Sequence, residues 1–164
     1  MSNEQQTSYK IAIGSDHHGI EVRKKLSKLL LEHGHTVTNY GPESPEPPVD
    51  YPDIASAVAE RVGAGEVDRG ILICGTGIGM CIAANKFPGV RAAPIIDEVS
   101  ADVSRRHNDL NILCLSAEML SEVMIEHLAE VWLKTPFDGG RHQKRLDAIK
   151  EIEQCGHKTI TETD

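Results

Sequence analysis

One stretch of the sequence decides the fold: Arg69-Gly70-Ile71-Leu72-Ile73-Cys74-Gly75-Thr76-Gly77-Ile78-Gly79-Met80. Its apolar residues from Ile71 to Ile73 are typical of a strand that is buried on both faces. The strand ends at Cys74 in a glycine-rich turn, and residues 80–86 predict the start of a helix. A strand, a glycine turn and a helix together present backbone N–H groups and the positive end of a helix dipole to an anion. The stretch therefore predicts a buried strand that ends in an anion-binding turn.

Cys74 stands at the tip of this predicted strand. An electropositive turn favours the thiolate form of a cysteine. The alternative interpretation is a buried structural thiol, because free cysteines are often core residues. The other cysteines, Cys81, Cys114 and Cys155, complete neither a Cys-x-x-Cys pair nor a zinc-ligand spacing. The cysteines therefore indicate reduced thiols in a cytosol, and we expect no metal site.

Length and charge exclude several classes of protein. At 164 residues the chain is long enough for one domain with a core and short for two. A net charge of −8 argues against a nucleic-acid partner, because phosphate backbones are bound by basic faces. No apolar run reaches the roughly 20 residues of a membrane span, and the polar residues 1–8 are no signal peptide. We therefore expect a cytoplasmic protein without a membrane partner. Its predicted organisation is a disordered tail at residues 1–8, one domain at 9–155 and a flexible tail at 156–164.

Strands and helices alternate along the whole chain. The predicted strands are residues 9–14, 35–40, 70–74, 90–96 and 111–115. Apolar residues at helical spacing predict four amphipathic helices, with these stripes: Val22, Leu26, Leu29 and Leu30; Ile54, Ala55, Val58, Ala59 and Val62; Met124, Leu128, Val131 and Trp132; Leu146, Ile149 and Ile152. A further helix is predicted through Val99 and Val103. The alternation predicts an α/β fold, a single-domain, doubly wound, Rossmann-like parallel sheet of about five strands. The last stripe has little to pack on, so we expect that helix to dock on a second subunit.

Polar residues gather where the predicted strands end. Asp16 and His17 follow the first strand, and the segment from Cys74 to Gly79 follows the central one. Parallel sheets bind ligands beyond the carboxyl ends of their strands, near a switch point in strand order. Asp16 has the alternative interpretation of a helix cap. The convergence of the two loops predicts a ligand site.

Three common sites are disfavoured by the glycine turn itself. A dinucleotide fingerprint needs Gly-x-Gly-x-x-Gly after the first strand, and the turn reads Gly75-x-Gly77-x-Gly79 after a middle strand. The Walker sequence Gly-x-x-x-x-Gly-Lys-Ser/Thr is missing. A cysteine phosphatase would need an arginine at position 80, where Met80 stands.

Proton transfer next to a sugar carbonyl fits the residues better. That reaction needs a base near carbon, donors for an enediolate oxygen and an acid–base pair that opens the sugar ring. Cys74 is the candidate base, Thr76 to Gly79 are the candidate donors, and Asp16, His17 and His107 are candidates for ring opening. Arg141 and Arg145 would share one face of a helix and suit a phosphate. In the alternative interpretation, His107 and Asn108 only end a helix and the two arginines are solvated. The other histidines are interpreted as structural or exposed: His18, His33, His35, His127 and His157.

Six motifs run in order over roughly residues 9 to 154: Ser15-Asp16-His17-x-Gly19, Asp50-Tyr51-Pro52, Cys74-Gly75-Thr76-Gly77-Ile78-Gly79, Ala83-Ala84-Asn85-Lys86, His107-Asn108-Asp109 and Gly140-Arg141-His142-Gln143-x-Arg145. Together they closely resemble the type B ribose-5-phosphate isomerases, of the superfamily that includes galactose-6-phosphate isomerase subunits.

The resemblance implies a role for each matched residue. It implies that Cys74 moves the proton between carbons 1 and 2, that Asp16 and His107 open the ring, and that Asn108 binds sugar oxygens. The enediolate would be held by Thr76 and by the amides of Gly75, Gly77, Ile78 and Gly79. The phosphate would be held by His17, Arg141 and Arg145, and Tyr51 would line the pocket. It further implies a homodimer without metal or cofactor, sometimes paired into tetramers, with each site built from two subunits.

The implied reaction interconverts ribose 5-phosphate and ribulose 5-phosphate. Two alternatives stay open: isomerisation of a 6-phospho-hexose such as allose or galactose 6-phosphate, and a non-catalytic sugar-phosphate binding module. One position departs from the resemblance. The family commonly carries Gly-x-Arg after the fifth strand, with an arginine that helps to hold phosphate, whereas this chain has Ser116-Ala117-Glu118. Either Arg141, Arg145 and His17 suffice for the phosphate, or Glu118 turns away, or the substrate differs.

Overall fold

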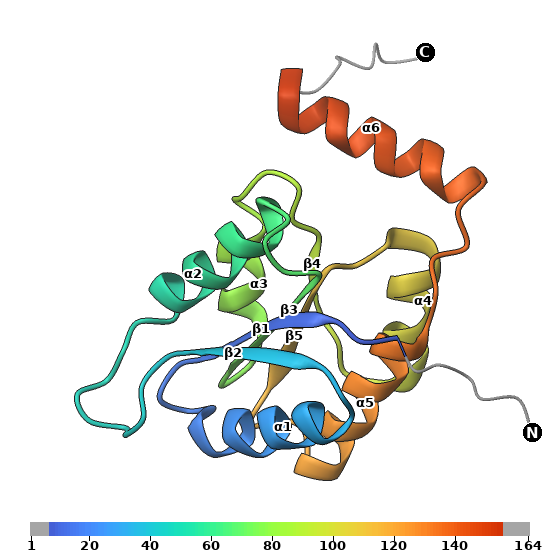
Figure 1. Ribbon diagram of the computed structural model, residues 1–164. Helices are drawn as coiled ribbons and strands as arrows, with labels where there is room; N and C mark the ends of the chain where they lie inside the picture. Colours follow the sequence, from blue (N-terminus) through green and yellow to red (C-terminus); the bar gives the residue numbers. More distant parts are fainter. Residues whose placement is uncertain (1–6, 156–164) are drawn as a thin grey trace, which may run out of the picture.

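The computed structural model describes residues 7–155, which form a five-stranded parallel sheet with helices on both faces (Figure 1). The strands are β1 (Lys10–Ser15), β2 (Thr36–Tyr40), β3 (Arg69–Cys74), β4 (Ala92–Pro94) and β5 (Ile112–Ser116). Their order in the sheet is β2-β1-β3-β5-β4, and all four pairings are parallel. The predicted α/β fold with a parallel sheet is confirmed.

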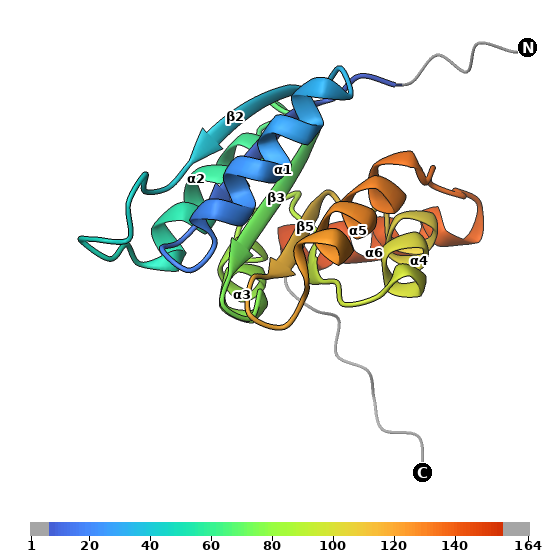
Figure 2. The same cartoon turned by 90° about the horizontal axis from the view of Figure 1, so that it is seen from below.

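The described residues also form six helices: α1 (Ile20–Glu32), α2 (Tyr51–Gly63), α3 (Ile78–Ala84), α4 (Glu98–Asn108), α5 (Glu122–Lys134) and α6 (Arg141–Cys155). Two apolar clusters show how they cover the sheet. One joins α1, α4 and α5 to one face, and the other joins α2 and α3 to the opposite face. Figure 2 shows α1 and α5 on the same side of the sheet. The result is a three-layer sandwich.

The central strands are buried because both of their faces pack against helices. Side chains alternate along β3, so that Ile71 and Ile73 face the cluster of α1, α4 and α5, while Leu72 and Cys74 face that of α2 and α3. Trp132 of α5 is fully buried in the first cluster. Continuous apolar strands are the expected signature of a sheet covered on both faces.

The helix predictions hold with small shifts. In α2, Pro52 stands in the first turn and the five predicted residues are the buried ones. The glycine turn is tighter than predicted, because α3 already begins at Ile78. In α5 the buried stripe is Ile125, Leu128, Ala129, Trp132 and Leu133, whereas the predicted Met124 is 40% exposed. The sequence spacing located this helix but placed its buried face slightly wrongly.

The predicted strand at 90–96 is much shorter in the structure. Only Ala92 to Pro94 pair, and they pair with β5 alone at the edge of the sheet. Pro94 has no N–H group to donate to a ladder, so it is tolerated at an edge and ends the pairing early.

Helix α6 lies outside the three layers and contacts them with part of its surface (Figure 1). Leu146 is buried, but Ile149 and Ile152 of the predicted stripe are 42% and 52% exposed. The carboxylate of Glu153 accepts the N–H of Gly89, at 3.1 and 3.2 Å from its two oxygens. The helix begins at Arg141, so Arg141 and Arg145 both belong to it. Docking of α6 on a partner stays a prediction.

Some expectations reach beyond the described part of the chain. Of the two predicted tails, residues 1–6 and 156–164 lie outside the described residues. Within residues 7–155, none of the helices combines the length and apolar character that a membrane span requires.

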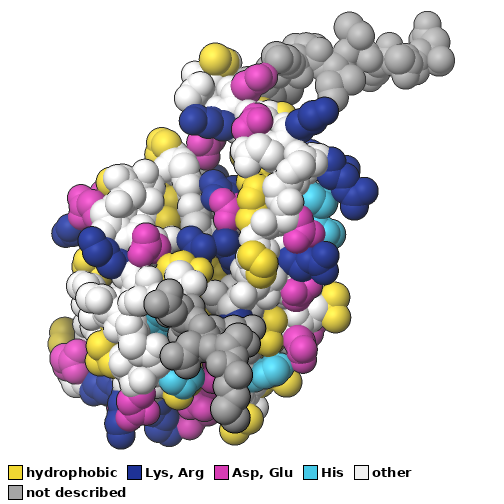
Figure 3. Space-filling model, turned by 45° about the vertical axis from the view of Figure 1, so that its right-hand side comes forward, with side chains coloured by type: hydrophobic (Ala, Val, Ile, Leu, Met, Phe, Trp, Pro, Cys, Tyr) yellow, Lys and Arg dark blue, Asp and Glu magenta, His cyan; other side chains and the backbone are white. Residues whose placement is uncertain are grey.

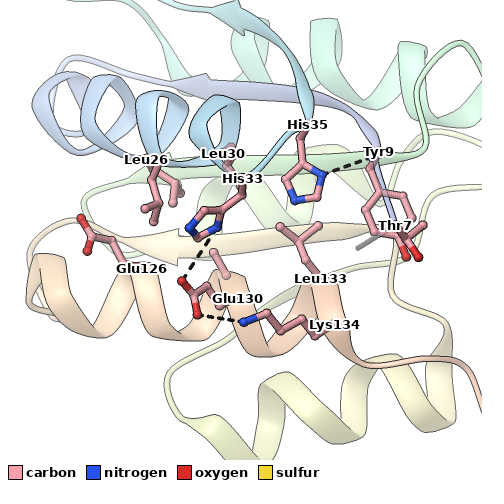
Figure 4. Close-up of a pocket in the computed structure, with 12 residues that line it drawn as sticks. Thr7, Tyr9, Leu26, Leu30, His33, His35, Glu126, Glu130, Leu133 and Lys134 are labelled. Atoms are coloured by element: carbon pink, nitrogen blue, oxygen red, sulfur yellow. Dashed lines mark hydrogen bonds and ion pairs between the residues drawn. The ribbon is translucent and has the colours of Figure 1, made fainter. Parts of the chain in front are cut away.

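A cavity of about 560 Å³ lies between α1 and α5 (Figure 4). Tyr9, His33 and His35 stand among its lining residues. Tyr9 and His35 precede β1 and β2, so this cavity opens near the amino ends of these strands, at the opposite edge of the sheet from Cys74. His35 is buried, and its Nδ1 accepts the Tyr9 N–H at 3.2 Å.

The buried histidine predicts a loss of stability in mild acid. Burial lowers the pKa of His35, and the neighbouring His33 lowers it further. The unfolded chain therefore binds a proton on His35 more tightly than the folded chain does. The contribution of neutral His35 to the free energy of unfolding is present above the ordinary pKa of about 6.5 and is lost as the pH falls below it. We expect His35→Asn to flatten the decline in the free energy of unfolding between pH 7 and 5, measured by urea denaturation. His127→Asn, at an exposed histidine paired with Glu98, is the control. An unchanged slope in His35→Asn would contradict the prediction.

Candidate active site

The ends of β1 and β3 bring Asp16 and Cys74 to the same edge of the sheet. Ser15 pairs with Ile73, and the Asp16 N–H donates to the Ile73 carbonyl at 3.2 Å. On the other side of β3, Cys74 pairs with Ser116 at the end of β5. The predicted convergence of the two loops is therefore present in the structure.

The turn after β3 is built around Gly77 and the thiol of Cys74. The Gly77 N–H donates to the Cys74 Sγ at 3.1 Å. Gly77 has a φ of +77°, a left-handed conformation that favours glycine. The Ile78 N–H donates to the Thr76 hydroxyl at 3.3 Å. The turn thus directs an N–H group at the sulfur of a thiol that is 5% exposed.

The loop after β5 is tied to this turn. The Ser116 hydroxyl donates to the Gly75 carbonyl at 2.5 Å and accepts the Met119 N–H at 2.9 Å. The Ala117 N–H donates to the Cys74 carbonyl at 2.9 Å, and the Glu118 N–H to the Gly75 carbonyl at 3.1 Å. The three bonds to Cys74 and Gly75 fix the two loops relative to each other, and the bond from Met119 holds the Ser116 hydroxyl in place.

Asp16 is buried beside the turn and does not cap α1. The cap position of α1 is Gly19, and no side chain caps it. One carboxylate oxygen of Asp16 instead accepts the His18 N–H at 2.9 Å. The interpretation of Asp16 as a helix cap is therefore wrong, and its carboxylate is held within the loop.

His17 and Tyr51 flank the same turn from the side of α2. The His17 Nδ1 lies 3.4 Å from the Val49 carbonyl. The ring of Tyr51 packs against Gly79, where a Cβ would lie only 2.7 Å from two ring carbons. Gly79 is thus required by the close approach of an aromatic ring, as well as by the predicted turn.

Two further side chains lie in this group: His18, which was expected to be structural or exposed, and Glu118, which does not turn away from the turn. Glu118 extends over Gly75, and a Cβ on Gly75 would lie 3.0 Å from its Oε1. His18 lies between two carboxylates, 3.5 Å from Asp16 Oδ2 and 3.6 Å from Glu118 Oε1. The sequence held one signal for His18, its place beside Asp16 and His17. We call Asp16, His17, His18, Tyr51, residues 74–79 and Glu118 the carboxyl-edge group.

The other predicted site residues form a second group around the end of α4. His107 stacks on His142, with ring centroids 4.1 Å apart and an angle of 8° between the planes. The Arg141 Nε lies 3.4 Å from the His142 Nε2. Desolvation lowers the pKa of His142, and His107, Arg141 and Arg145 lower it further. We call His107, Asn108, Asp138, Arg141, His142 and Arg145 the amino-edge group.

Within one chain the two groups lie at opposite edges of the sheet. Helix α4 ends at Asn108, shortly before β5 begins, whereas Cys74 pairs with the last residue of β5. The Asn108 carbonyl accepts from Arg91, which directly precedes β4, at 3.1 Å. The end of α4 and Cys74 are therefore separated by four residue steps along β5, which is about 13 Å at the rise of a parallel strand. The described chain does not bring His107, Asn108, Arg141 and Arg145 to Cys74.

The two groups differ in charge. The carboxyl-edge group holds the carboxylates of Asp16 and Glu118 and no lysine or arginine. The amino-edge group holds Arg141 and Arg145, and Arg106 forms an ion pair with Asp138 at 3.1 Å beside it. Figure 3 shows Lys, Arg and His side chains gathered where α6 joins the body. A phosphate therefore fits the amino-edge group better.

Each group also contains a set of possible metal ligands, Asp16 with His17 and His18, and His107 with Asp138 and His142. In the second set Asp138 is already paired with Arg106, and Arg141 lies against His142. Positive neighbours disfavour a cation at that place. The donor chemistry there suits an anion, in line with the expected phosphate.

A second thiol lies close to the turn. Cys81 of α3 has its pKa lowered to about 7, first by a hydrogen bond with Cys114 and, against the effect of burial, also by one with Asn85. The amide of Asn85 spans α3 and β4, because it donates to the Ala92 carbonyl at 2.8 Å and accepts the Ala92 N–H at 2.9 Å. A thiol reagent directed at Cys74 can therefore also label Cys81, so such labelling needs a Cys81 variant as its control.

Known proteins are similar to this chain over most of its length. The sequence profile of the family described as Ribose/Galactose Isomerase matches residues 11–149. The chain is 46% identical over 145 residues to ribose-5-phosphate isomerase B of Escherichia coli, covering 88% of this chain and 97% of that protein. It is 38% identical over 140 residues to D-erythrulose-4-phosphate isomerase of Pectobacterium atrosepticum, covering 85% and 91%.

Among solved structures, the fold is similar to ribose-5-phosphate isomerase B from Mycoplasma genitalium with bound ribulose-5-phosphate. The TM-score is 0.86 at 41% identity, over 89% of this chain and 97% of that one. The likeness extends over nearly the whole length of both chains.

The glycine turn predicts a specific cost for a side chain at Gly77. Gly77 and Gly34 both have positive φ, but a Cβ at Gly77 would lie 3.2 Å from the Leu115 carbonyl group, whereas Gly34 has open space. We expect Gly34→Ala to cost about 1 kcal/mol of unfolding free energy, from backbone strain alone. Gly77→Ala should cost about 1–3 kcal/mol more, because β5 must move. Urea denaturation of both variants checks this, and equal losses would contradict it.

Proposed function

The chain belongs to the ribose/galactose isomerase family, and we propose that it interconverts D-ribose 5-phosphate and D-ribulose 5-phosphate. It is an isomerase, and its resemblance to the type B ribose-5-phosphate isomerases is confirmed by the family profile and the relatives over most of the chain. The proposal concerns the substrate, the base and the assembly of the site.

One observation carries the proposed chemistry: the Cys74 thiol at the end of β3, with the Gly77 N–H directed at its sulfur at 3.1 Å. A thiolate in a turn of N–H groups is a base that can reach a carbon-bound proton. We infer that Cys74 removes the proton from one of carbons 1 and 2 and returns it to the other, through a cis-enediolate.

The turn amides supply the second requirement of this reaction. As the proton leaves, negative charge develops on the carbonyl oxygen, and fixed donors stabilise it more than they stabilise the neutral substrate. The proposed donors are Thr76 and the amides of Gly75, Gly77, Ile78 and Gly79. The hydrogen bonds from the loop after β5 to Cys74 and Gly75 hold this turn in place before substrate binds.

Asp16 is proposed to take part in ring opening. Its carboxylate is buried, lies close to the turn and is held beside His17 and His18. It pairs with no lysine or arginine among the residues that the structure describes. Tyr51 lines the pocket from α2. The proposal assigns His17 to the phosphate, as the resemblance implies.

We propose further that the complete site forms between two copies of this chain. Neither group is sufficient alone: the carboxyl-edge group holds the base and no arginine, and the amino-edge group holds the proposed phosphate ligands Arg141 and Arg145. In a two-fold dimer every contact across the single interface occurs twice, so two complete sites form together. The exposed Ile149 and Ile152 of α6 provide apolar surface for such an interface. His107 would then join Asp16 in ring opening, and Asn108 would bind sugar oxygens.

The length of the sugar is the least constrained part of the proposal. A relative in the family is named for a four-carbon substrate, D-erythrulose 4-phosphate. Four-, five- and six-carbon phosphates, including allose and galactose 6-phosphate, therefore belong in the same assay.

Proton NMR in heavy water tests the reaction and the base together. The wild-type protein should convert ribose 5-phosphate to ribulose 5-phosphate with deuterium entering the sugar. Cys74→Ala should lower turnover by about 10²-fold or more, because the base is lost. Cys81→Ala is the matched control and should keep most of the activity. Near-normal turnover in Cys74→Ala would exclude the thiol as the base, and binding of the sugar phosphates without exchange would favour a binding module.

Mixing two inactive variants tests the shared site. Cys74→Ala and His107→Ala homodimers should each be nearly inactive. When they are unfolded together and refolded, random pairing places one intact site in each mixed dimer, which restores about one quarter of the wild-type activity. Activity that stays at the level of the two variants would exclude a site built from two chains.

A further inference from the structure

The cavity between α1 and α5 contains a buried hydrogen-bond donor. The cavity measures about 560 Å³ and shares no lining residue with the carboxyl-edge group or the amino-edge group. His35 lines it and is 7% exposed. Because the His35 Nδ1 accepts the Tyr9 N–H at 3.2 Å, Nδ1 carries no proton and the neutral ring carries its proton on Nε2. Burial, which lowers the pKa of His35, favours this neutral ring.

The Nε2–H of His35 faces the cavity. Figure 4 shows the ring of His35 directed into the cavity, with one nitrogen bonded to Tyr9 and the other on the side of Leu133. Among residues 7–155, no acceptor lies within hydrogen-bond distance of Nε2. A buried donor without an acceptor costs free energy, so a ligand that accepts this hydrogen bond is stabilised by more than its apolar contacts.

The wall of the cavity is apolar, and the charges at its rim are paired. Leu26 and Leu30 of α1 are buried core residues that line it. At the rim, Glu130 lies 3.2 Å from the Lys134 Nζ and 3.9 Å from the His33 Nδ1. An anionic ligand therefore finds no free cation among the described lining residues, and the His35 donor repels a cationic ligand. An apolar cavity of this size with one fixed polar group suits a small uncharged molecule.

We propose that this cavity is a binding site for a small, uncharged, apolar molecule with one carbonyl group, whose oxygen accepts the Nε2–H of His35. The leucines of α1 and α5 contact its apolar part. A carbonyl oxygen only accepts hydrogen bonds, which matches a site with one buried donor, whereas a hydroxyl group would bring a second donor to the same depth. The inference does not depend on the proposed reaction, since the lining residues belong to neither group of proposed site residues.

Two probes of nearly the same shape test the site by NMR titration. They are acetophenone and isopropenylbenzene, in which a CH₂ group replaces the carbonyl oxygen. We expect both probes to bind to the wild-type protein, because the apolar contacts are the same. In protein labelled with 15N at histidine, acetophenone alone should shift the Nε2 resonance of His35.

His35→Phe keeps an aromatic ring and removes the donor. We expect it to lower the affinity for acetophenone relative to that for isopropenylbenzene by about tenfold, the scale of one neutral hydrogen bond. Comparing the two probes within one protein cancels their difference in hydrophobicity. His127→Phe makes the same change at an exposed histidine of α5 that does not line the cavity, and it should leave the ratio of affinities unchanged.

Leu29→Trp tests whether the probes bind in this cavity, and it serves also if His35→Phe does not fold. Leu29 is a half-buried lining residue, so a larger side chain there should fill the cavity and weaken both probes by about fivefold or more. Three results each overturn the inference: no binding of acetophenone, a ratio that His35→Phe leaves unchanged, or affinities that Leu29→Trp leaves unchanged. Turnover of sugar phosphates is not a readout here, so failure of the proposed function is a separate result.

Discussion

The candidate site depends on the close packing of two loops at the carboxyl edge of the sheet. The turn after β3 passes so near the end of β5 that a side chain at Gly77 would meet the Leu115 backbone. Hydrogen bonds from Ser116, Ala117 and Glu118 hold the turn from that side. Because the turn cannot relax away from β5, its Gly77 N–H stays directed at the Cys74 thiol. A preorganised donor of this kind costs no rearrangement when charge develops nearby.

The same parallel architecture explains why one chain carries two separate groups. A helix between parallel strands must return the chain from the carboxyl edge to the amino edge, so the residues at the end of α4 lie a full strand length from the end of β3. His107 and Asn108 are therefore separated from Cys74 by the geometry of the sheet itself. The separation also keeps Arg141 and Arg145 away from Asp16 and Glu118. The proposed second copy of the chain would bring Arg141 and Arg145 to Cys74.

The sequence by itself determined how strands and helices alternate along the chain, because strand burial and helix amphipathicity are local patterns. The residues from Ile71 to Ile73 and the apolar stripe of α2 display these patterns clearly. It also located the glycine turn and most members of both groups. It predicted too long a strand at β4, where Pro94 ends the pairing early. Only the tertiary structure showed that Asp16 does not cap α1, that His18 contacts Glu118 over Gly75, and that His107 lies at the opposite edge of the sheet from Cys74. Each of these three points depends on which loops become neighbours in the fold.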